Sequence, residues 1–231
     1  MCPDLSWTAH INDIVSCAKV VASWVLSVFK TRAVDVMCTL YKCLVRSHLE
    51  YCCPLWNPAK ISEIQPLEEV QRSFTARIWG VKHLNYWDRL KSLKMMSLQR
   101  RRERYINIQM WKILNGKCPN DVNIRFMAPS RRGIKSVIPP LNRQSSRKNQ
   151  TLYDDSFAVL GPRLWNALPA ELSESTQKDA FKHRLTKFML SFPDEPPVRG
   201  YSRANGNSIL DWCSGEADRM LHGWSGDVMT Q

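Results

Sequence analysis

The stretch Leu93-Lys-Met-Met-Ser-Leu-Gln-Arg-Arg-Arg-Glu-Arg-Tyr-Ile-Asn-Ile-Gln-Met-Trp-Lys-Ile-Leu-Asn-Gly116 contains a complete helix signal. Ser97 can cap the helix, because its hydroxyl can accept a free backbone N–H of the first turn. Gly116 can adopt the left-handed conformation that ends a helix. The apolar residues between them recur at helical spacing: Ile106, Met110, Ile113 and Leu114. The sequence therefore predicts a helix with one buried face.

Three arginines at the start of this helix, Arg100, Arg101 and Arg104, fall mostly off the apolar stripe. A helix N-terminus favours anions, so a basic start opposes the helix dipole. A local rule that is broken without a gain in stability often marks a functional site. We therefore predict a guanidinium cluster that faces an anionic partner. The alternative is a solvated basic face, or a set of partners for nearby acids.

The overall charge supports an anionic partner. The 231 residues carry 33 Lys plus Arg against 21 Asp plus Glu, a net charge of +12. From Pro193 to the end, three arginines stand against six acids, so residues 1–192 carry +15. A basic chain of this kind favours partners such as nucleic acid.

The remaining helical patterns predict an all-α fold, because no segment has a convincing strand period. Helices are expected over about 8–31, 32–49, 61–79 (or 66–79), 86–93 and 176–191. The predicted organisation is a helical bundle over 1–117, a long basic loop or linker over 118–152, a smaller C-terminal helical segment over 153–192 and a flexible tail over 193–231.

Motifs for chemistry are weak. Asp154 and Asp155 follow Tyr153, but two-metal polymerase chemistry needs carboxylates that converge on two ions, and the flanking segments offer no strand partner. His48 with Cys52, and His10 with Cys17, lack the spacing of a zinc site. The Cys residues lack a signature of Cys-His nucleophilic catalysis. We therefore predict no catalytic residue, cofactor or metal site in this chain.

Targeting signals are weak as well. The N-terminus lacks a basic region followed by an apolar core, which a secretory signal requires. The apolar run from Val20 to Phe29 is interrupted and too short to span a bilayer. Eight scattered cysteines then indicate reduced thiols. We expect an intracellular protein, nuclear or cytoplasmic, with no membrane partner.

Basic residues interleaved with aromatic rings are the strongest functional signal. Between Lys82 and Arg104 eight basic residues stand against two acids. Lys and Arg neutralise backbone phosphates, and aromatic rings can stack on bases, although core packing is the more common role of such rings. We predict contacts to phosphate and shape rather than to base sequence. The predicted nucleic-acid-binding residues are Arg72, Arg77, Lys82, Arg89, Lys94, Arg100, Arg101 and Arg104.

Several linked motifs occur in a fixed order along the chain. They are Leu5-Ser6-Trp7-x-x-His10-Ile11, His48-Leu49-Glu50-Tyr51, Trp56-Asn57-Pro58, Leu67-Glu68-x-Val70-Gln71-Arg72-x-Phe74-Thr75, Tyr86-x-x-Arg89-Leu90, Ser97-Leu98-x-x-Arg101-Arg102, Lys112-Ile113-Leu114-Asn115-Gly116, Gly161-Pro162-Arg163-Leu164-Trp165-Asn166-x-Leu168-Pro169 and Phe181-Lys182-x-x-Leu185. Together they resemble the region downstream of the palm in reverse transcriptases of non-LTR (long interspersed element) retrotransposons, over roughly residues 4–192.

The resemblance implies a helical thumb and C-terminal region that grips RNA and RNA–DNA hybrid. The fingers, the palm and the catalytic aspartates of the family have no counterpart in these motifs, and Asp154 and Asp155 lie far downstream of any palm position. The resemblance therefore implies a fragment of an RNA-directed DNA polymerase that is inactive alone. A palm-containing polymerase chain is a possible partner, and Mg²⁺ is expected only where a palm is present.

Three other interpretations remain open at this point. The chain could be a helical protein-interaction or scaffold module with a basic surface. It could itself be a polymerase, which the missing palm motifs oppose. It could also be a retroelement remnant without a selected function.

Overall fold

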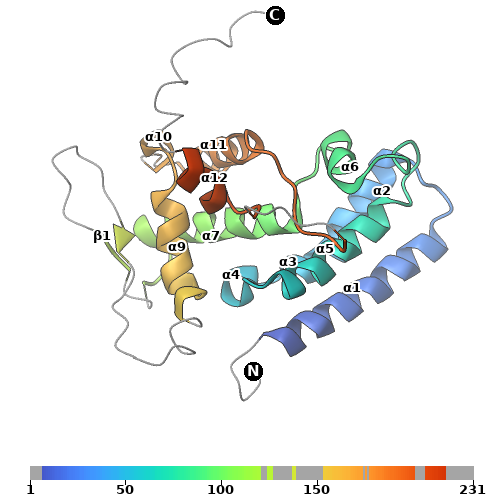
Figure 1. Ribbon diagram of the computed structural model, residues 1–231, viewed down its shortest axis with the longest axis horizontal. Helices are drawn as coiled ribbons and strands as arrows, with labels where there is room; N and C mark the ends of the chain where they lie inside the picture. The colour runs from blue at the N-terminus through green and yellow to red at the C-terminus, as the bar shows by residue number, and fades with distance from the viewer. Residues whose placement is uncertain are drawn as a thin grey trace, which may run out of the picture.

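The computed structural model describes residues 7–120, 124–126, 137–138, 153–173, 175, 177–200 and 206–216. Over these residues the chain is mostly helical, which confirms the predicted all-α class (Figure 1). One small addition is an antiparallel pair of two-residue strands, β1 (Arg125–Phe126) and β2 (Val137–Ile138). Most of the predicted basic loop over 118–152 lies outside the described residues.

The predicted helices are present in order, and further short helices lie between and after them. The first group is α1 (Thr8–Val28), α2 (Val34–Leu40), the π-helical segment η1 (Tyr41–Val45), α3 (Arg46–Glu50), α4 (Cys53–Trp56), α5 (Ile61–Thr75) and α6 (Tyr86–Ser92). The second group is α7 (Leu98–Leu114), α9 (Phe157–Asn166), α10 (Ala170–Ser173), α11 (Lys178–Leu190) and α12 (Ile209–Glu216). The helix predicted over 32–49 is therefore α2, η1 and α3 in direct succession.

The end of α5 differs from the prediction. This helix contains Pro66 and ends at Thr75, whereas the pattern predicted an end near Trp79. The backbone N–H groups of Arg77 and Ile78 donate to the carbonyls three residues back, those of Phe74 and Thr75. This 3₁₀-type bonding replaces the α-helical pattern after Thr75. Ile78 is buried and continues the apolar spacing of α5, so the sequence pattern predicted a helix that reached it.

Both predicted ends of α7 are confirmed. The Ser97 hydroxyl accepts a hydrogen bond from the Arg100 backbone N–H at 3.0 Å. Gly116 has a φ of +66°, the left-handed conformation that glycine adopts without steric cost.

Helix α7 lies in the middle of the molecule and belongs to two hydrophobic cores (Figure 1). Its start, Leu98, packs in a core formed mainly by α1 to α6. Its later residues, Ile106, Met110 and Trp111 among them, pack with α9 and α11 in the second core. The predicted helical region and the predicted C-terminal segment therefore share one helix.

Part of the segment predicted as a flexible tail packs against the helices. Residues 193–200 and 206–212, called the C-terminal strap below, cross the start of α7, and Val198 and Ile209 are buried in the first and second cores respectively. Backbone carbonyls of the strap accept hydrogen bonds from other elements, as Val198 does from Gln65 and Pro196 from Trp87. The proline-rich composition indicated flexibility, but buried prolines and paired carbonyls hold this segment. The rest of the predicted tail, 201–205 and 217–231, lies outside the described residues.

Helix α1 ends near the predicted end, and its 21 residues extend well beyond the apolar run from Val20 to Phe29 that the sequence analysis judged too short to span a bilayer. By length and composition alone it could cross a membrane, a test that core helices of water-soluble proteins also pass. One face packs into the first core through Ile11, Val15, Ala18, Ala22 and Val25. The opposite face exposes Val20, Trp24 and Val28 at 67%, 56% and 52%.

Candidate nucleic-acid interface

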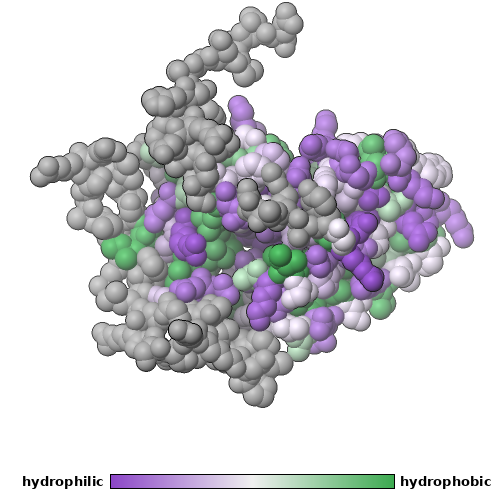
Figure 2. Space-filling view, viewed as in Figure 1, coloured by the Kyte–Doolittle hydropathy of each residue, from purple (hydrophilic) through white to green (hydrophobic). Residues whose placement is uncertain are grey.

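Three of the predicted contact residues, Arg77, Lys82 and Lys94, are exposed at the end of the molecule that carries α5 and α6. Arg77 and Lys82 lie in the turns after α5, and Lys94 follows α6. Lys91 and His83 are exposed in the same segment, and the sequence analysis did not select them. These five residues are called the basic corner below. Hydrophilic side chains gather over this end of the molecule (Figure 2).

The cations of the basic corner are available to a ligand. Within the described part of the chain, no ion pair involves any of these five residues. Gly80, with a φ of +78°, allows the chain to turn between Arg77 and Lys82. Unpaired and exposed cations retain their full capacity to neutralise phosphates.

Arg72 and Arg89 lie close to this corner but are less available. The Arg72 guanidinium forms an ion pair with Glu69 at 3.2 Å. Arg89 is only 5% exposed, and its guanidinium lies 6.0 Å from the centre of the Tyr86 ring. Burial lowers the pKa of Arg89. The prediction that Arg89 contacts nucleic acid at the surface is therefore wrong, because its side chain is buried.

Arg101 and Arg104 are half-buried and already have partners. Arg101 pairs with the carboxylate of Glu50 through both Nε and Nη2, and Nη2 also donates to the Tyr105 hydroxyl at 2.9 Å. Arg104 donates from Nε to the Thr186 hydroxyl at 2.9 Å. The Arg101 charge is therefore paired within the protein, and one donor of Arg104 is occupied by a neutral hydroxyl.

Arg100 is the largest correction to the predicted interface, because its side chain is fully buried. The guanidinium donates to the carbonyl oxygens of Met189 and Pro193, both at 2.9 Å, and of Asn207 at 3.2 Å. The helical pattern placed Arg100 off the apolar stripe, but α11 and the C-terminal strap cover that side of α7. Arg100 holds these segments together and does not face solvent.

The start of α7 does not break the dipole rule. The Asp194 carboxylate accepts hydrogen bonds from the backbone N–H and the hydroxyl of Ser97, both at 2.7 Å. The Glu68 carboxylate accepts from the Gln99 backbone N–H, also at 2.7 Å. Two acids therefore occupy the anion-favouring end of the helix. The sequence could not show this, because Asp194 lies 97 residues from Ser97.

Asp194 therefore contributes to stability. We expect Asp194→Ala to lower the free energy of unfolding by about 1–2 kcal/mol, because the capped helix start loses its acceptor. Urea unfolding followed by circular dichroism measures this loss. Asp179→Asn is the control, since this exposed carboxylate forms an ion pair with Lys182 on the helix surface. An Asp194→Ala protein as stable as the parent would contradict the assignment.

Two carboxyl groups are buried beside the start of α7. Burial raises the pKa of Glu68 to about 7, and burial likewise raises the pKa of Glu103 to about 7. Glu68 also accepts a hydrogen bond from the Tyr86 hydroxyl at 2.7 Å. Glu103 accepts from the backbone N–H of Ile209 at 3.1 Å and so binds the strap.

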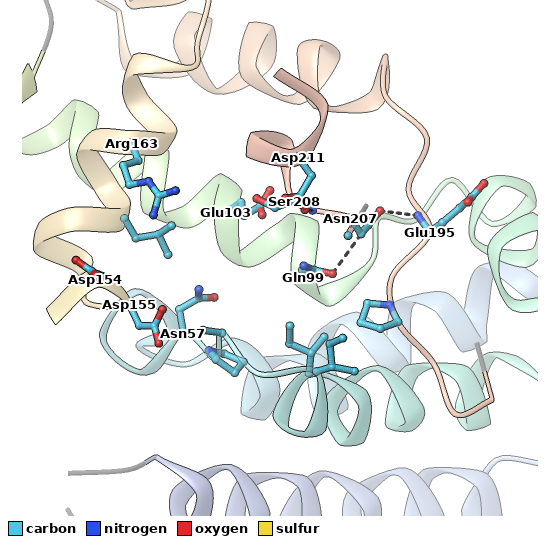
Figure 3. Close-up of a pocket in the computed structure, with 17 residues that line it drawn as sticks. Asn57, Gln99, Glu103, Asp154, Asp155, Arg163, Glu195, Asn207, Ser208 and Asp211 are labelled. Atoms are coloured by element: carbon cyan, nitrogen blue, oxygen red, sulfur yellow. Dashed lines mark hydrogen bonds between the residues drawn. The ribbon is translucent and has the colours of Figure 1, made fainter. Parts of the chain in front are cut away.

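An acidic cleft of about 280 Å³ opens beside these groups (Figure 3). Its lining includes five acids and one exposed arginine: Glu103, Asp154, Asp155, Glu195, Asp211 and Arg163. Glu103 keeps part of its proton near pH 7, but the four other acids outnumber Arg163, and their negative charge disfavours phosphates. The cleft is therefore separate from the candidate nucleic-acid interface.

Asp154 and Asp155 lie on the wall of this cleft (Figure 3). Burial, and next the charge of Asp154, raise the pKa of Asp155. Across the described ranges, no group of three or more His, Cys, Asp or Glu side chains is placed to hold a metal ion.

Comparison of the chain with protein-family models, curated proteins and solved structures finds no match. The function is therefore inferred from the placement of the charged side chains and from the motifs of the sequence.

Proposed function

We propose that this chain binds RNA and RNA–DNA hybrid as the thumb and C-terminal region of a non-LTR retrotransposon reverse transcriptase, without polymerase activity of its own. The observation that supports binding most directly is the basic corner. There Arg77, Lys82 and Lys94 are exposed and, among the described residues, form no ion pair. The order of the sequence motifs supports the choice of family.

The placement of the cations indicates how the ligand is held. Long, exposed Lys and Arg side chains contact phosphate oxygens without reading bases. The acidic cleft repels the same backbone, so the two charged regions favour one orientation of the ligand. Arg72, half-buried beside the corner, can add a contact if Glu69 releases it.

The salt dependence of binding tests this proposal. With about five phosphate contacts, the log of the association constant should fall with log salt with a slope of about −4. The variant Arg77→Ala/Lys82→Ala/Lys94→Ala should have a slope shallower by about 2 to 3, because binding releases fewer counterions when phosphate contacts are lost. Fluorescence anisotropy with a labelled RNA–DNA hybrid measures both slopes.

A matched control carries Lys19→Ala, Lys117→Ala and Lys178→Ala. These three lysines are exposed and lie on other parts of the molecule, so net charge changes equally. The control should keep nearly the slope of the parent protein. Equal slopes for the two triple variants would show that only net charge matters, and undetectable binding by the parent at low salt would refute the proposal.

A second candidate function is a protein-interaction module, favoured by α1. Its outer face exposes Val20, Trp24 and Val28 at a spacing of four residues, a continuous apolar stripe. A palm-containing polymerase chain is one partner that such a stripe could contact. This function predicts that Trp24→Glu abolishes partner binding while hybrid binding by the basic corner is unchanged. If the chain binds only nucleic acid, the triple variant of the basic corner weakens hybrid binding and Trp24→Glu has no effect on it.

A further inference from the structure

A groove of about 490 Å³ separates α1 from α3 on the surface of the first helical group. The residues from α1 occupy one helix face, at positions 10, 13, 14 and 17, and those from α3 and its end lie opposite. Among the described residues the lining is His10, Asp13, Ile14, Cys17, Ser47, His48 and Tyr51. A nucleophile, two imidazoles and apolar walls are therefore gathered in one open groove, and the nucleic-acid proposal uses none of them.

The central contact of this groove joins a thiol and an imidazole. Cys17 Sγ lies 3.8 Å from His48 Nδ1, within hydrogen-bond reach for sulfur, and both residues are exposed. With Nδ1 as the acceptor, the imidazole is placed to take the thiol proton. A nucleophile next to a base in this way is the usual arrangement for thiolate chemistry.

The other described cysteines differ from Cys17, and Cys118 among them is half-buried. Cys38 and Cys53 are buried, and burial raises the pKa of both thiols, that of Cys53 to about 12. Cys43 and Cys52 are exposed like Cys17. Within the described residues, however, neither of these two thiols has a hydrogen-bond partner. Cys17 therefore combines solvent access with an adjacent base.

We propose that Cys17, with His48 as proton acceptor, is a thiol–disulfide exchange site for small neutral disulfides. The Cys17 sulfur attacks one sulfur of the disulfide, the S–S bond breaks, and a mixed disulfide forms on Cys17. The departing thiolate takes the proton that His48 accepted and leaves as a thiol. Ile14 and Tyr51 supply apolar walls for the organic group, and the Asp13 carboxylate disfavours an anionic disulfide.

Mass spectrometry of the full chain tests this site. The protein is incubated with hydroxyethyl disulfide, and the mixed disulfide at each cysteine is quantified over time in peptide digests. Cys17 should react about tenfold faster than Cys43 and Cys52. His48→Gln should slow Cys17 by about tenfold, because the proton acceptor is lost, and should leave Cys43 unchanged.

Two variants make the result specific. Ser23→Ala changes an exposed residue of α1 outside the groove lining and should not alter the rate at Cys17. Cys17→Ser should remove the fast phase alone and leave the rates of the other cysteines as they were. A Cys17 rate equal to those of Cys43 and Cys52 would overturn the proposal. So would a Cys17 rate that His48→Gln leaves unchanged, or a His48→Gln protein in which every cysteine changes rate together.

Discussion

Replacement of Arg100 by alanine is expected to destabilise the protein by about 3–5 kcal/mol, a large part of the stability of an ordinary domain. The guanidinium is fully buried and donates to three backbone carbonyls, two in the C-terminal strap and one in α11. Without it these acceptors stay buried and unpaired, and a cavity forms at the start of α7. Urea unfolding followed by circular dichroism gives the loss.

The control for this experiment is Arg77→Ala, which removes the same charge from an exposed position. Its stability should stay within about 0.5 kcal/mol of the parent, as is usual for surface changes. Arg100→Met should lose less than Arg100→Ala, because methionine fills most of the space but cannot donate to the carbonyls. Equal stability of the Arg100→Ala and Arg77→Ala proteins would show that the buried network contributes nothing.

The second large effect is a fall in stability as pH rises from 5 to 7.5. Burial raises the pKa of Glu68 and of Glu103 to about 7, above the ordinary 4.5 of an unfolded glutamate. Between these values the native state keeps protons that the unfolded chain has released, so each unit of pH weakens the native state. Each carboxyl group should contribute about 2–3 kcal/mol over this range. Urea titrations at several pH values measure the slope.

A variant assigns the slope to these groups. Glu103→Gln removes one of the two buried titrations and should remove about half of the pH dependence. Asp179→Asn removes an exposed carboxylate on α11 and should leave the slope as in the parent. Stability that is constant or rises between pH 5 and 7.5 would contradict the assignment.

Much of the fold was predictable because its signals are local. The cap at Ser97, the left-handed Gly116 and the spacing of Ile106 and Met110 determine α7 within one stretch of chain. Apolar residues at helical spacing also predicted the other helices of the bundle. Some helix ends were predicted wrongly, such as the end of α5, because they depend on short turns rather than on the apolar pattern.

The division of the arginines was not predictable, because it depends on contacts between distant segments. Arg100, Arg101 and Arg104 are close in sequence, yet Arg100 meets the strap, Arg101 meets Glu50 and Arg104 meets Thr186. The proline-rich composition predicted a flexible tail where the strap lies. The order of the strap comes from paired carbonyls and from two buried apolar residues, which composition does not show. The exposed members of the predicted set, Arg77 and Lys82 among them, lie in turns that no described element covers.

Lysine acetylation with and without bound RNA–DNA hybrid, read by mass spectrometry, tests the proposed interface most directly. We expect the hybrid to protect Lys82, Lys91 and Lys94 in the basic corner, while Lys19 and Lys178 react as in the free protein. Protection spread evenly over all five lysines, or absent from the basic corner, would contradict it.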